Sequence, residues 1–319
     1  MQFQKTSEIK LSVVVPVFKE ESNIAPFLSR TIATLTRINE SYEVVFVLDP
    51  SPDRTEDEIV KASEVNARIK LIKMSRRFGQ PAATMAGLHF AIGESVVVID
   101  ADLQDPIELI PTLIERWEQT GADVVLARRK TRDEDTIFRR TVSALYISVF
   151  RKLSGVDLHP NVGEFRLMSR AVVEAFSSMP ERQRFVRGML AWLGFKVEIV
   201  DYIRPARAGG KSSFNLFRLF ELGVQGITAF SIKPLRMATI FGLITALGSG
   251  IYAIFIFAEA INNRTPVPGY ASLLITVLFL GGMQLLFLGI IGEYLGRVLL
   301  ESKARPNYVI RKVYKGNGR

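Results

Sequence analysis

The sequence predicts an α/β protein in which a mostly parallel β-sheet is followed by an amphipathic segment and two membrane-spanning helices. Over the first two-thirds of the 319 residues, short β-branched apolar runs alternate with helical patterns of about 10–15 residues. This alternation is typical of a parallel sheet with crossover helices. The last third instead holds two long runs without charge, at residues 237–258 and 271–292.

Strands are expected where β-branched and aromatic residues cluster, and helices where apolar residues recur at helical spacing. Pro16 cannot donate to a ladder, so the first strand should stop near it. The expected strands are residues 11–18, 42–48, 69–74, 96–99 and 123–126, and the expected helices are residues 24–38, 56–65, 82–92, 109–117 and 139–150.

The central strand ends abruptly in Asp-Ala-Asp-Leu-Gln-Asp-Pro, residues 100–106. In an extended backbone Asp100, Asp102 and Gln104 would project from one side, at the edge where open α/β sheets bind ligands. Their oxygens suit Mg²⁺ or Mn²⁺, which proteins usually hold by one or two carboxylates plus substrate phosphates. For the Asp-x-Asp pair alone, a solvated loop is the alternative.

Composition restricts the partners. Lys and Arg number 41 against 32 Asp and Glu, a formal net charge of +9. This balance fits a phosphorylated substrate or an anionic membrane surface, whereas no basic helix with interleaved aromatics indicates nucleic acid. Without cysteine, any metal must be bound by oxygen or by one of two histidines. The first apolar run is too short for a signal peptide, so the front of the protein is expected in the cytoplasm.

The first two strands also end in acidic residues, Glu20 and Asp49. No Gly-x-Gly-x-x-Gly follows any strand, which removes the main support for a dinucleotide site. Carboxylates at strand ends can accept hydrogen bonds from ribose hydroxyls or from a base edge. Turn chemistry and helix capping are the alternative for both residues.

Three segments carry a family resemblance: Val-Pro-Val-Phe-Lys-Glu (15–20), Asp-Pro-Ser-Pro-Asp-Arg-Thr (49–55) and residues 100–106. Together they resemble inverting family 2 glycosyltransferases with the Rossmann-like GT-A fold. The most similar branch is the polyprenyl-phosphate glycosyltransferases, which include GtrB-type bactoprenol glucosyltransferases and dolichol-phosphate mannose synthases. The resemblance implies that a divalent metal lies among Asp100, Asp102 and Gln104. It also implies a nucleotide pocket lined by Pro16, Val17, Glu20, Asp49 and Asp100.

Two segments depart from the family pattern. The usual Asp-Asp-Gly-Ser turn reads Leu-Asp-Pro-Ser at residues 48–51, and Glu164 replaces the aspartate of the Gly-Asp-Phe-Arg-Leu segment. In relatives that carboxylate lies near the sugar and the acceptor, so the resemblance implies Asp100, Asp102 and Glu164 as the catalytic carboxylates. The extra methylene of Glu164 moves its charge by roughly 1.5 Å, and a displacement of about 1 Å can cost about 100-fold. Either the backbone compensates, or the position is a less demanding one.

Basic residues follow the last expected strand and precede the membrane runs. Arginine binds phosphate through two parallel hydrogen bonds, and a solvated basic face is the alternative. The resemblance points to Arg128, and to Arg139 or Arg140, as ligands of an acceptor phosphate. Lys211 ends a basic loop that resembles the family's mobile loop before the membrane, and it is a further candidate ligand.

Each charge-free run would span about 33 Å, enough for a hydrocarbon core of about 30 Å. Lys and Arg flank the pair on both outer sides, which predicts a multi-pass inner-membrane protein with both termini and the catalytic domain in the cytoplasm. The expected parts are a GT-A domain (1–210), an amphipathic juxtamembrane segment (211–235), a two-helix membrane region (236–300) and a basic tail (301–319). Gly292 and Gly296 have a helix-packing spacing, a hint of a homo-oligomer.

The expected function is inverting, metal-dependent transfer of a hexose, with UDP-glucose as donor, to undecaprenyl phosphate at the cytoplasmic membrane face. A phosphate monoester has a second pKa of about 6 and is largely dianionic near neutrality, so it can attack without a general base. The alternatives are transfer of mannose or another sugar to a polyprenyl phosphate, and a non-catalytic transferase-like membrane scaffold.

Overall fold

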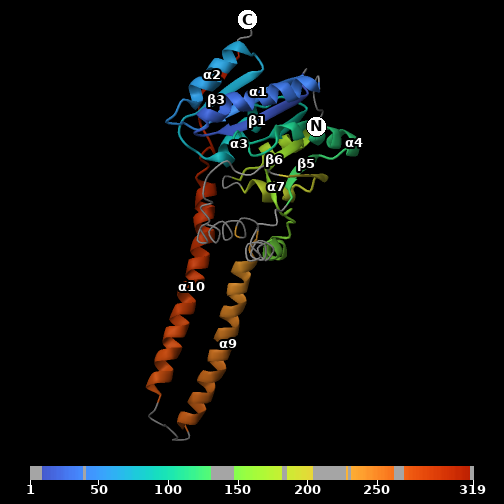
Figure 1. The fold of residues 1–319 in the computed structure, drawn as a ribbon. Helices are drawn as coiled ribbons and strands as arrows, with labels where there is room; N and C mark the ends of the chain where they lie inside the picture. The colour runs from blue at the N-terminus through green and yellow to red at the C-terminus, as the bar shows by residue number, and fades with distance from the viewer. Residues whose placement is uncertain are drawn as a thin grey trace. The chain divides into compact units, whose positions relative to one another are not determined.

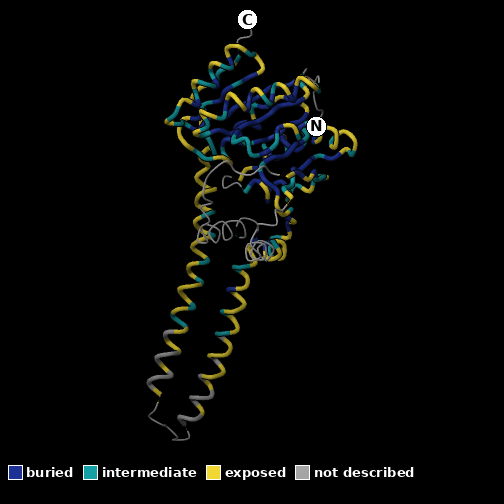
Figure 2. Tube along the Cα trace, viewed as in Figure 1, coloured by how far each residue is buried: buried dark blue, intermediate teal, exposed yellow. Residues whose placement is uncertain are grey.

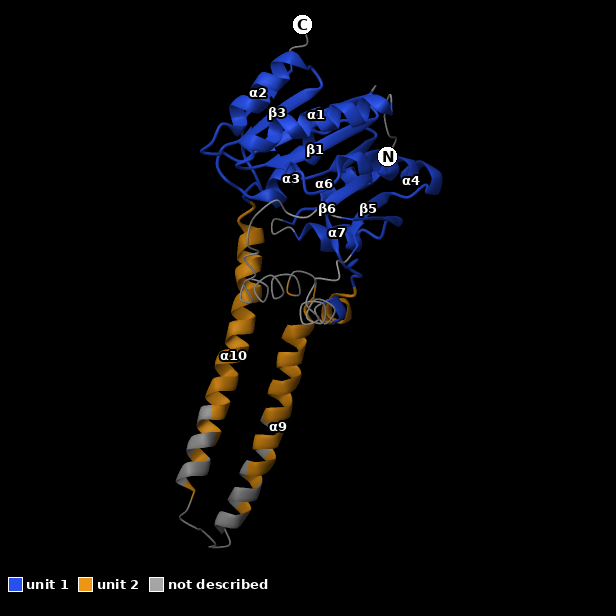
Figure 3. Ribbon diagram, viewed as in Figure 1, with its two compact units in different colours: residues 1–148, 156–215, 305–319 blue, residues 149–155, 216–304 orange. Residues whose placement is uncertain are grey.

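The computed structural model describes residues 9–38, 41–130, 147–181, 185–203, 228, 231–261 and 269–316. The chain divides into two compact units, shown in different colours in Figure 3. Unit 1 comprises residues 1–148, 156–215 and 305–319, and unit 2 comprises residues 149–155 and 216–304. Arg139, Arg140 and Lys211 lie outside the described residues, as does most of the expected amphipathic segment.

The described part of unit 1 is built on one eight-stranded sheet with the order β7-β5-β6-β4-β1-β2-β3-β8. Parallel pairs join β1 to β2 and β4, β2 to β3, and β5 to β7. The prediction of an α/β fold with a mostly parallel sheet is therefore confirmed, although β6 and β8 run antiparallel to their neighbours. The strands are β1 (Leu11–Val17), β2 (Tyr42–Leu48), β3 (Ile69–Met74), β4 (Ser95–Val98), β5 (Val124–Arg129), β6 (Val162–Ser169), β7 (Val197–Tyr202) and β8 (Ile310–Lys315).

Helices cover the sheet of unit 1, and Figures 1 and 2 show its strands as the most buried part of the chain. The expected strands at residues 42–48 and 69–74 have the observed bounds, whereas the helices begin one to three residues earlier than expected or, for the fourth, one residue later. The helices are α1 (Glu21–Arg37), α2 (Thr55–Val65), α3 (Gln80–Phe90), the 3₁₀ turn η1 (Ile107–Leu109), α4 (Ile110–Thr120), α6 (Arg170–Ser178) and α7 (Val186–Trp192).

The central strands β1, β2 and β4 are buried along their whole length, which is why their sequences are continuous apolar runs. On one face, Phe27 of α1 packs edge-on against Phe46, with 6.0 Å between ring centroids. On the other face, a Cβ on Gly87 of α3 would lie 2.2 Å from Cγ1 of Val14 and 3.1 Å from Cγ2 of Val47. Only glycine fits so close an approach, so Gly87 fixes α3 against β1 and β2.

The C-terminal tail is not only a basic extension. Its residues Ile310–Lys315 form β8, which pairs antiparallel with β3 at the edge of the sheet. Tyr314 donates a hydrogen bond to Oε1 of Glu56 at 2.9 Å, and a Cβ on Gly316 would lie 2.6 Å from Cα of Ala67. The prediction of a separate tail over residues 301–319 is therefore wrong for this strand.

Unit 2 contains two long helices, α9 (Lys233–Ile261) and α10 (Tyr270–Ser302). Tyr294 of α10 donates to the carbonyl of Ser231 at 2.6 Å, and the Ser231 hydroxyl donates to the carbonyl of Leu153 at 2.6 Å. Among the described residues one segment, Phe279–Ser302, is long and apolar enough to cross a membrane. The two expected spans fall within α9 and α10, but two crossings stay a prediction.

Gly292 and Gly296 do not bring another described helix close. A Cβ built on either residue would meet nothing within 4 Å. The homo-oligomer that their spacing suggests therefore also stays a prediction.

Candidate active site

Acidic side chains follow three strands that lie side by side. Because β4, β1 and β2 are parallel neighbours, their carboxyl ends meet at one edge of the sheet. Glu20 follows β1, Asp49 follows β2, and Asp100 follows β4. The topology therefore brings together residues that are 29 to 80 positions apart in the sequence.

The loop after β4 is a turn and not an extended continuation of the strand. β4 ends at Val98, Leu103 has φ 56, and the Gln104 amide donates to Oδ1 of Asp102 at 3.0 Å. The expectation that strand alternation aligns Asp100, Asp102 and Gln104 is therefore wrong. A side-chain-capped turn sets the positions of these residues instead.

The carboxylates nevertheless lie close enough for their charges to interact. Burial, followed by the charges of Asp102, Glu164 and Asp105, raises the pKa of Asp100 to about 7. Burial also raises the pKa of Glu20, and the charge of Asp102 acts in the same direction. Four predicted site residues, Glu20, Asp100, Asp102 and Glu164, thus form one anionic cluster.

This donor set fits a divalent cation that a substrate helps to bind. No group of three or more His, Cys, Asp or Glu side chains among the described residues is arranged to hold a metal. Asp100 and Asp102 would supply two carboxylates, and diphosphate oxygens would complete the shell, as is usual for Mg²⁺. A cation would also favour the charged form of Asp100, whose pKa is raised by burial and by the neighbouring like charges.

Asp49 holds the loop between β3 and α3. Its carboxylate is buried, with Oδ1 accepting from the Phe78 amide at 3.0 Å and Oδ2 from the Gly79 amide at 2.8 Å. Gly79 has φ 91, a conformation that favours glycine. The next residue, Gln80, donates from Nε2 to Oδ1 of Asp100 at 2.7 Å. The alternative of turn chemistry thus describes Asp49 here, and its contact with a nucleotide stays a prediction.

The polar turn after Asp49 fastens the loop that carries Glu20. Ser51 accepts from the Lys19 amide at 3.1 Å, and Thr55 accepts from the Glu20 amide at 2.9 Å. Asp53 in turn accepts from the hydroxyls of Ser51 at 2.5 Å and Thr55 at 2.7 Å. The Ser-x-Asp-x-Thr spacing of residues 51–55 therefore allows hydrogen bonds that join the loop after β2 to the loop after β1.

Pro16 and Val17 are buried within β1. The Val17 carbonyl accepts from the Asp49 amide at 3.2 Å. Their side chains therefore pack inside the sheet, and a nucleotide pocket lined by them stays a prediction.

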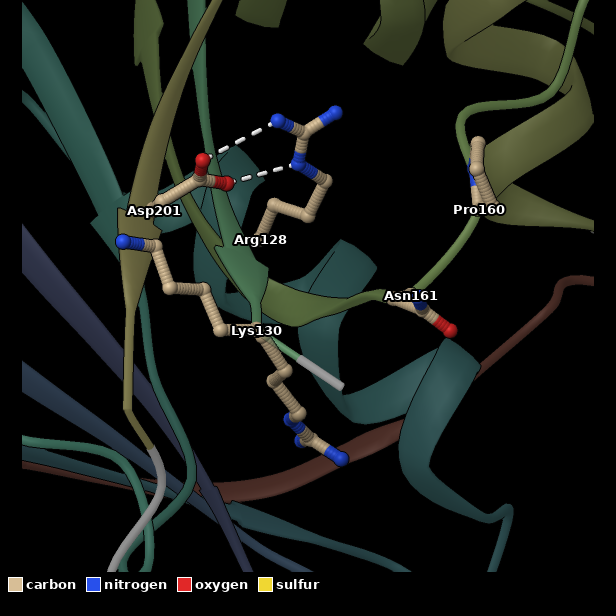
Figure 4. Close-up of a pocket in the computed structure, with 6 residues that line it drawn as sticks. Arg128, Lys130, Pro160, Asn161 and Asp201 are labelled. Atoms are coloured by element: carbon tan, nitrogen blue, oxygen red, sulfur yellow. Dashed lines mark hydrogen bonds and ion pairs between the residues drawn. The ribbon is translucent and has the colours of Figure 1, made fainter. Parts of the chain in front are cut away.

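Arg128 and Arg129 point to opposite faces of β5, as neighbouring strand residues must. Arg128 makes a two-pronged ion pair with Asp201 of β7, at 2.6 Å from Nε and 3.0 Å from Nη2. Figure 4 shows this pair in a pocket that Lys130 and Asn161 also line. The predicted phosphate ligand Arg128 is thus engaged by a carboxylate.

Arg129 instead takes part in a buried cluster with Asp105 and Tyr202. Its Nε donates to the Tyr202 hydroxyl at 3.0 Å, and its Nη2 lies 3.5 Å from Oδ1 of Asp105. Tyr202 donates to the same Oδ1 at 2.5 Å, and burial followed by that bond raises the pKa of Tyr202 to about 12. A Cβ on Gly163 would lie 2.9 Å from Arg129 Nη2, so glycine leaves the room for this guanidinium.

Glu164 is contacted by two arginines. It pairs with Arg166, whose side chain is 1% exposed, and lies 3.6 Å from Nε of Arg187. Arg166 also donates to the Glu164 carbonyl at 3.1 Å. The longer side chain is therefore held by its own strand β6 and by α7.

The sequence profile of glycosyl transferase family 2 matches residues 12–176, just over half of the chain, which includes the whole carboxylate cluster. The chain belongs to glycosyl transferase family 2. A second profile, the GtrB C-terminal hairpin, matches residues 233–298 of this transferase.

Relatives of the family 2 transferase match over almost its whole length. A prophage-derived bactoprenol glucosyl transferase of Shigella flexneri (SfII) is 43% identical over 310 residues, which cover 97% of this chain and 100% of that protein. A prophage bactoprenol glucosyl transferase homolog of Escherichia coli K12 is 43% identical over 309 residues, or 96% and 100%. The predictions of a glycosyltransferase and of the GtrB-type branch are confirmed.

A solved structure shows the same fold. Glucosyl-3-phosphoglycerate synthase of Mycobacterium tuberculosis, in complex with Mn²⁺, UDP and phosphoglyceric acid, superposes with a TM-score of 0.50. It is 20% identical and the match covers 69% of the family 2 transferase and 76% of the synthase.

Sequence reasoning missed four residues of this site in the family 2 transferase. Gln80 and Tyr202 show no local signal, because their contacts to Asp100 and Asp105 cross between elements. Arg129 is visible as part of a basic run, but only strand alternation tells it from Arg128. Arg187 could have been predicted as an ion-pair partner of Glu164, because a carboxylate in the β6 segment needs a positive charge near it.

Proposed function

We propose that this family 2 transferase moves glucose from UDP-glucose to a polyprenyl phosphate such as undecaprenyl phosphate, with inversion and with Mg²⁺ or Mn²⁺. The anionic cluster at the ends of β1 and β4 is the observation that carries the proposal, because such a cluster suits a cation-bound diphosphate. Full-length relatives named bactoprenol glucosyl transferases support the donor sugar and the lipid. A fold relative solved with Mn²⁺ and UDP agrees with the cation and the nucleotide.

The reaction is a single displacement. An acceptor phosphate oxygen bonds to the anomeric carbon while the bond from that carbon to the diphosphate oxygen breaks, which inverts the centre. The acceptor is largely dianionic near neutral pH, so no side chain has to remove a proton from it. The protein's tasks are to position the two substrates and to separate their negative charges.

Asp100 and Asp102 would hold the cation, which supplies positive charge to the departing diphosphate. Glu20, held by Thr55 and charge-coupled to Asp102, is placed to accept hydrogen bonds from the nucleoside. Glu164 is fixed by Arg166 and Arg187 and is charge-coupled to Asp100, and its proposed role is to orient the sugar.

Arg128 is the proposed ligand of the lipid phosphate. In the structure it holds the Asp201 carboxylate through both prongs of its guanidinium, which is how arginine also holds phosphate. Arg139, Arg140 and Lys211, outside the described residues, remain further proposed ligands.

The lipid acceptor requires a membrane site. Helices α9 and α10 expose many large apolar side chains, which a bilayer would cover. We propose that both helices span the inner membrane and that unit 1 and both termini face the cytoplasm, where basic residues flank the helices.

The test is transfer of labelled sugar into a lipid extract. Full-length protein in detergent receives polyprenyl phosphate, Mg²⁺ or Mn²⁺, and a panel of UDP- and GDP-sugars, with Asp102→Ala beside it. Label in lipid from UDP-glucose alone, lost in Asp102→Ala, is the expected result. Label from GDP-mannose or another donor would show that the proposed donor sugar is wrong. If no donor gave labelled lipid, the proposed lipid acceptor would be overturned.

A further inference from the structure

A side chain outside the sequence motifs makes a direct contact with the proposed metal site. Gln80 is the first residue of α3, and its Nε2 donates to Oδ1 of Asp100 at 2.7 Å. Among the described residues this is the hydrogen bond that reaches the Asp100 carboxylate from another element.

Two constraints place Gln80 there. The Asp49 carboxylate accepts hydrogen bonds from the amides of Phe78 and Gly79, the two residues immediately before Gln80. The absence of a side chain at Gly87, two turns further along α3, allows that helix to lie directly on β1 and β2. The end of β2 is therefore linked through the start of α3 to the end of β4.

The chemistry of the donor matters as much as its position. Asp100 lies among Asp102, Glu164 and Asp105, whose charges repel it. A lysine or arginine bound to Asp100 would neutralise the carboxylate and repel a cation. The amide of Gln80 binds Oδ1 of the carboxylate without cancelling its charge.

We propose that Gln80 is a positioning residue for divalent-metal binding by Asp100. This inference rests on the proposed function, in which Asp100 is a metal ligand. Partners that orient metal-binding side chains typically contribute about 10- to 100-fold to metal affinity, and Gln80 is the residue of this chain placed to do so for Asp100.

The test measures Mn²⁺ binding directly. Full-length protein in detergent is titrated with Mn²⁺ in the presence of UDP, and free Mn²⁺ is followed by its electron paramagnetic resonance signal. Gln80→Leu removes the donor, and Gln80→Lys keeps a donor but adds a positive charge. Gln119→Leu is the matched control, since Gln119 is an equally exposed glutamine whose Nε2 donates to Glu115 at 2.9 Å on α4.

Both Gln80 variants should raise the Kd for Mn²⁺ about tenfold, and Gln119→Leu should leave it unchanged. Transfer by Gln80→Leu should need about tenfold more Mn²⁺ for half-saturation, with kcat largely restored at saturating metal. A merely structural role would lower kcat and the melting temperature without moving the metal requirement.

Wild-type Mn²⁺ affinity in Gln80→Leu would overturn the inference and leave the proposed function intact. A wild-type protein that binds no Mn²⁺ with UDP would overturn both. An equal loss in Gln119→Leu would also overturn the inference, because the effect would then not depend on the contact with Asp100.

Discussion

Replacing Asp100 by asparagine should stabilise the metal-free protein while abolishing transfer. The carboxylate is crowded by burial and by three like charges, which raise its pKa from 3.8 to about 7. Asparagine has the same shape and no charge, and its Oδ1 can still accept the hydrogen bond from Gln80. The variant therefore removes the repulsion without removing that contact.

The size of the effect follows from the pKa. A shift from 3.8 to about 7 corresponds to about 4 kcal/mol at high pH, and solvent screening of this partly exposed group reduces it to about 2 kcal/mol. Because the folded carboxyl keeps its proton to higher pH than the unfolded one, the free energy of unfolding of the wild type falls as pH rises from about 4 through about 7. The Asp100→Asn variant lacks this fall. Its free energy of unfolding should therefore equal that of the wild type near pH 4 and exceed it by the whole of this difference at pH 8.

The assay is thermal unfolding in detergent with a chelator, followed by tryptophan fluorescence at pH 5 and pH 8. For a unit of this size, about 2 kcal/mol is about 4–8 °C in melting temperature. Asp201→Asn is the control of opposite sign, because the Arg128 guanidinium lowers the pKa of Asp201. Its stabilising contribution is present above the unfolded pKa and is lost as pH falls. Equal melting temperatures of Asp100→Asn and wild type at pH 8 would refute the reasoning.

Three further changes test the surroundings of the site. Asp201→Asn should release Arg128 for phosphate and lower the KM for the lipid about two- to fivefold, the modest effect expected of a solvent-exposed ion pair; a raised KM would contradict this. Gly163→Ala should push the Arg129 guanidinium from its place and destabilise by about 1–3 kcal/mol, measured by urea unfolding; wild-type stability would exclude the close approach. Tyr314→Phe should remove the hydrogen bond from β8 to α2 and lower stability by about 1 kcal/mol, with unchanged KM values; altered KM values would mean that β8 also shapes the site.

The sequence predicts the first four strands closely, because β1, β2 and β4 are buried apolar runs rich in valine and β3 alternates buried apolar residues with lysine. β6 was not predicted as a strand. Its sequence, Val-Gly-Glu-Phe-Arg-Leu-Met-Ser, mixes glycine and charges with apolar residues, and Arg166 becomes a buried side chain through its pairing with Glu164. Strand propensity alone does not indicate β6, because its pairing with β4 and β5, which are distant in the sequence, decides that it is a strand.

β8 was missed for another reason. Its partner β3 lies more than 230 residues earlier, and two long helices intervene. A short basic segment such as Ile310–Lys315 looks like a solvated tail until the edge of β3 is available to it. Lysine and arginine are also what an exposed edge strand carries to prevent further pairing.

The site itself was predicted in composition but not in geometry. Glu20, Asp100 and Asp102 come together because the parallel neighbours β1 and β4 end at one edge. Glu164 lies near the start of β6, which runs antiparallel to β4, and its charge acts on Asp100. The turn at Leu103 was not foreseen, since a non-glycine residue with positive φ has no dependable sequence signal.

The distribution of positive charge around the cluster is uneven, which agrees with the proposed cation at Asp100. The arginines engage its outer carboxylates, with Arg129 at Asp105 and Arg187 at Glu164. Asp100 receives a neutral amide instead, and its pKa stays raised because of burial and of the like charges of Asp102, Glu164 and Asp105. A guanidinium at that position would make a more stable resting protein but would occupy the place of the metal. In the proposed function, the repulsion that Asp100→Asn should relieve is the same repulsion that a divalent cation bound with the diphosphate would offset at this carboxylate.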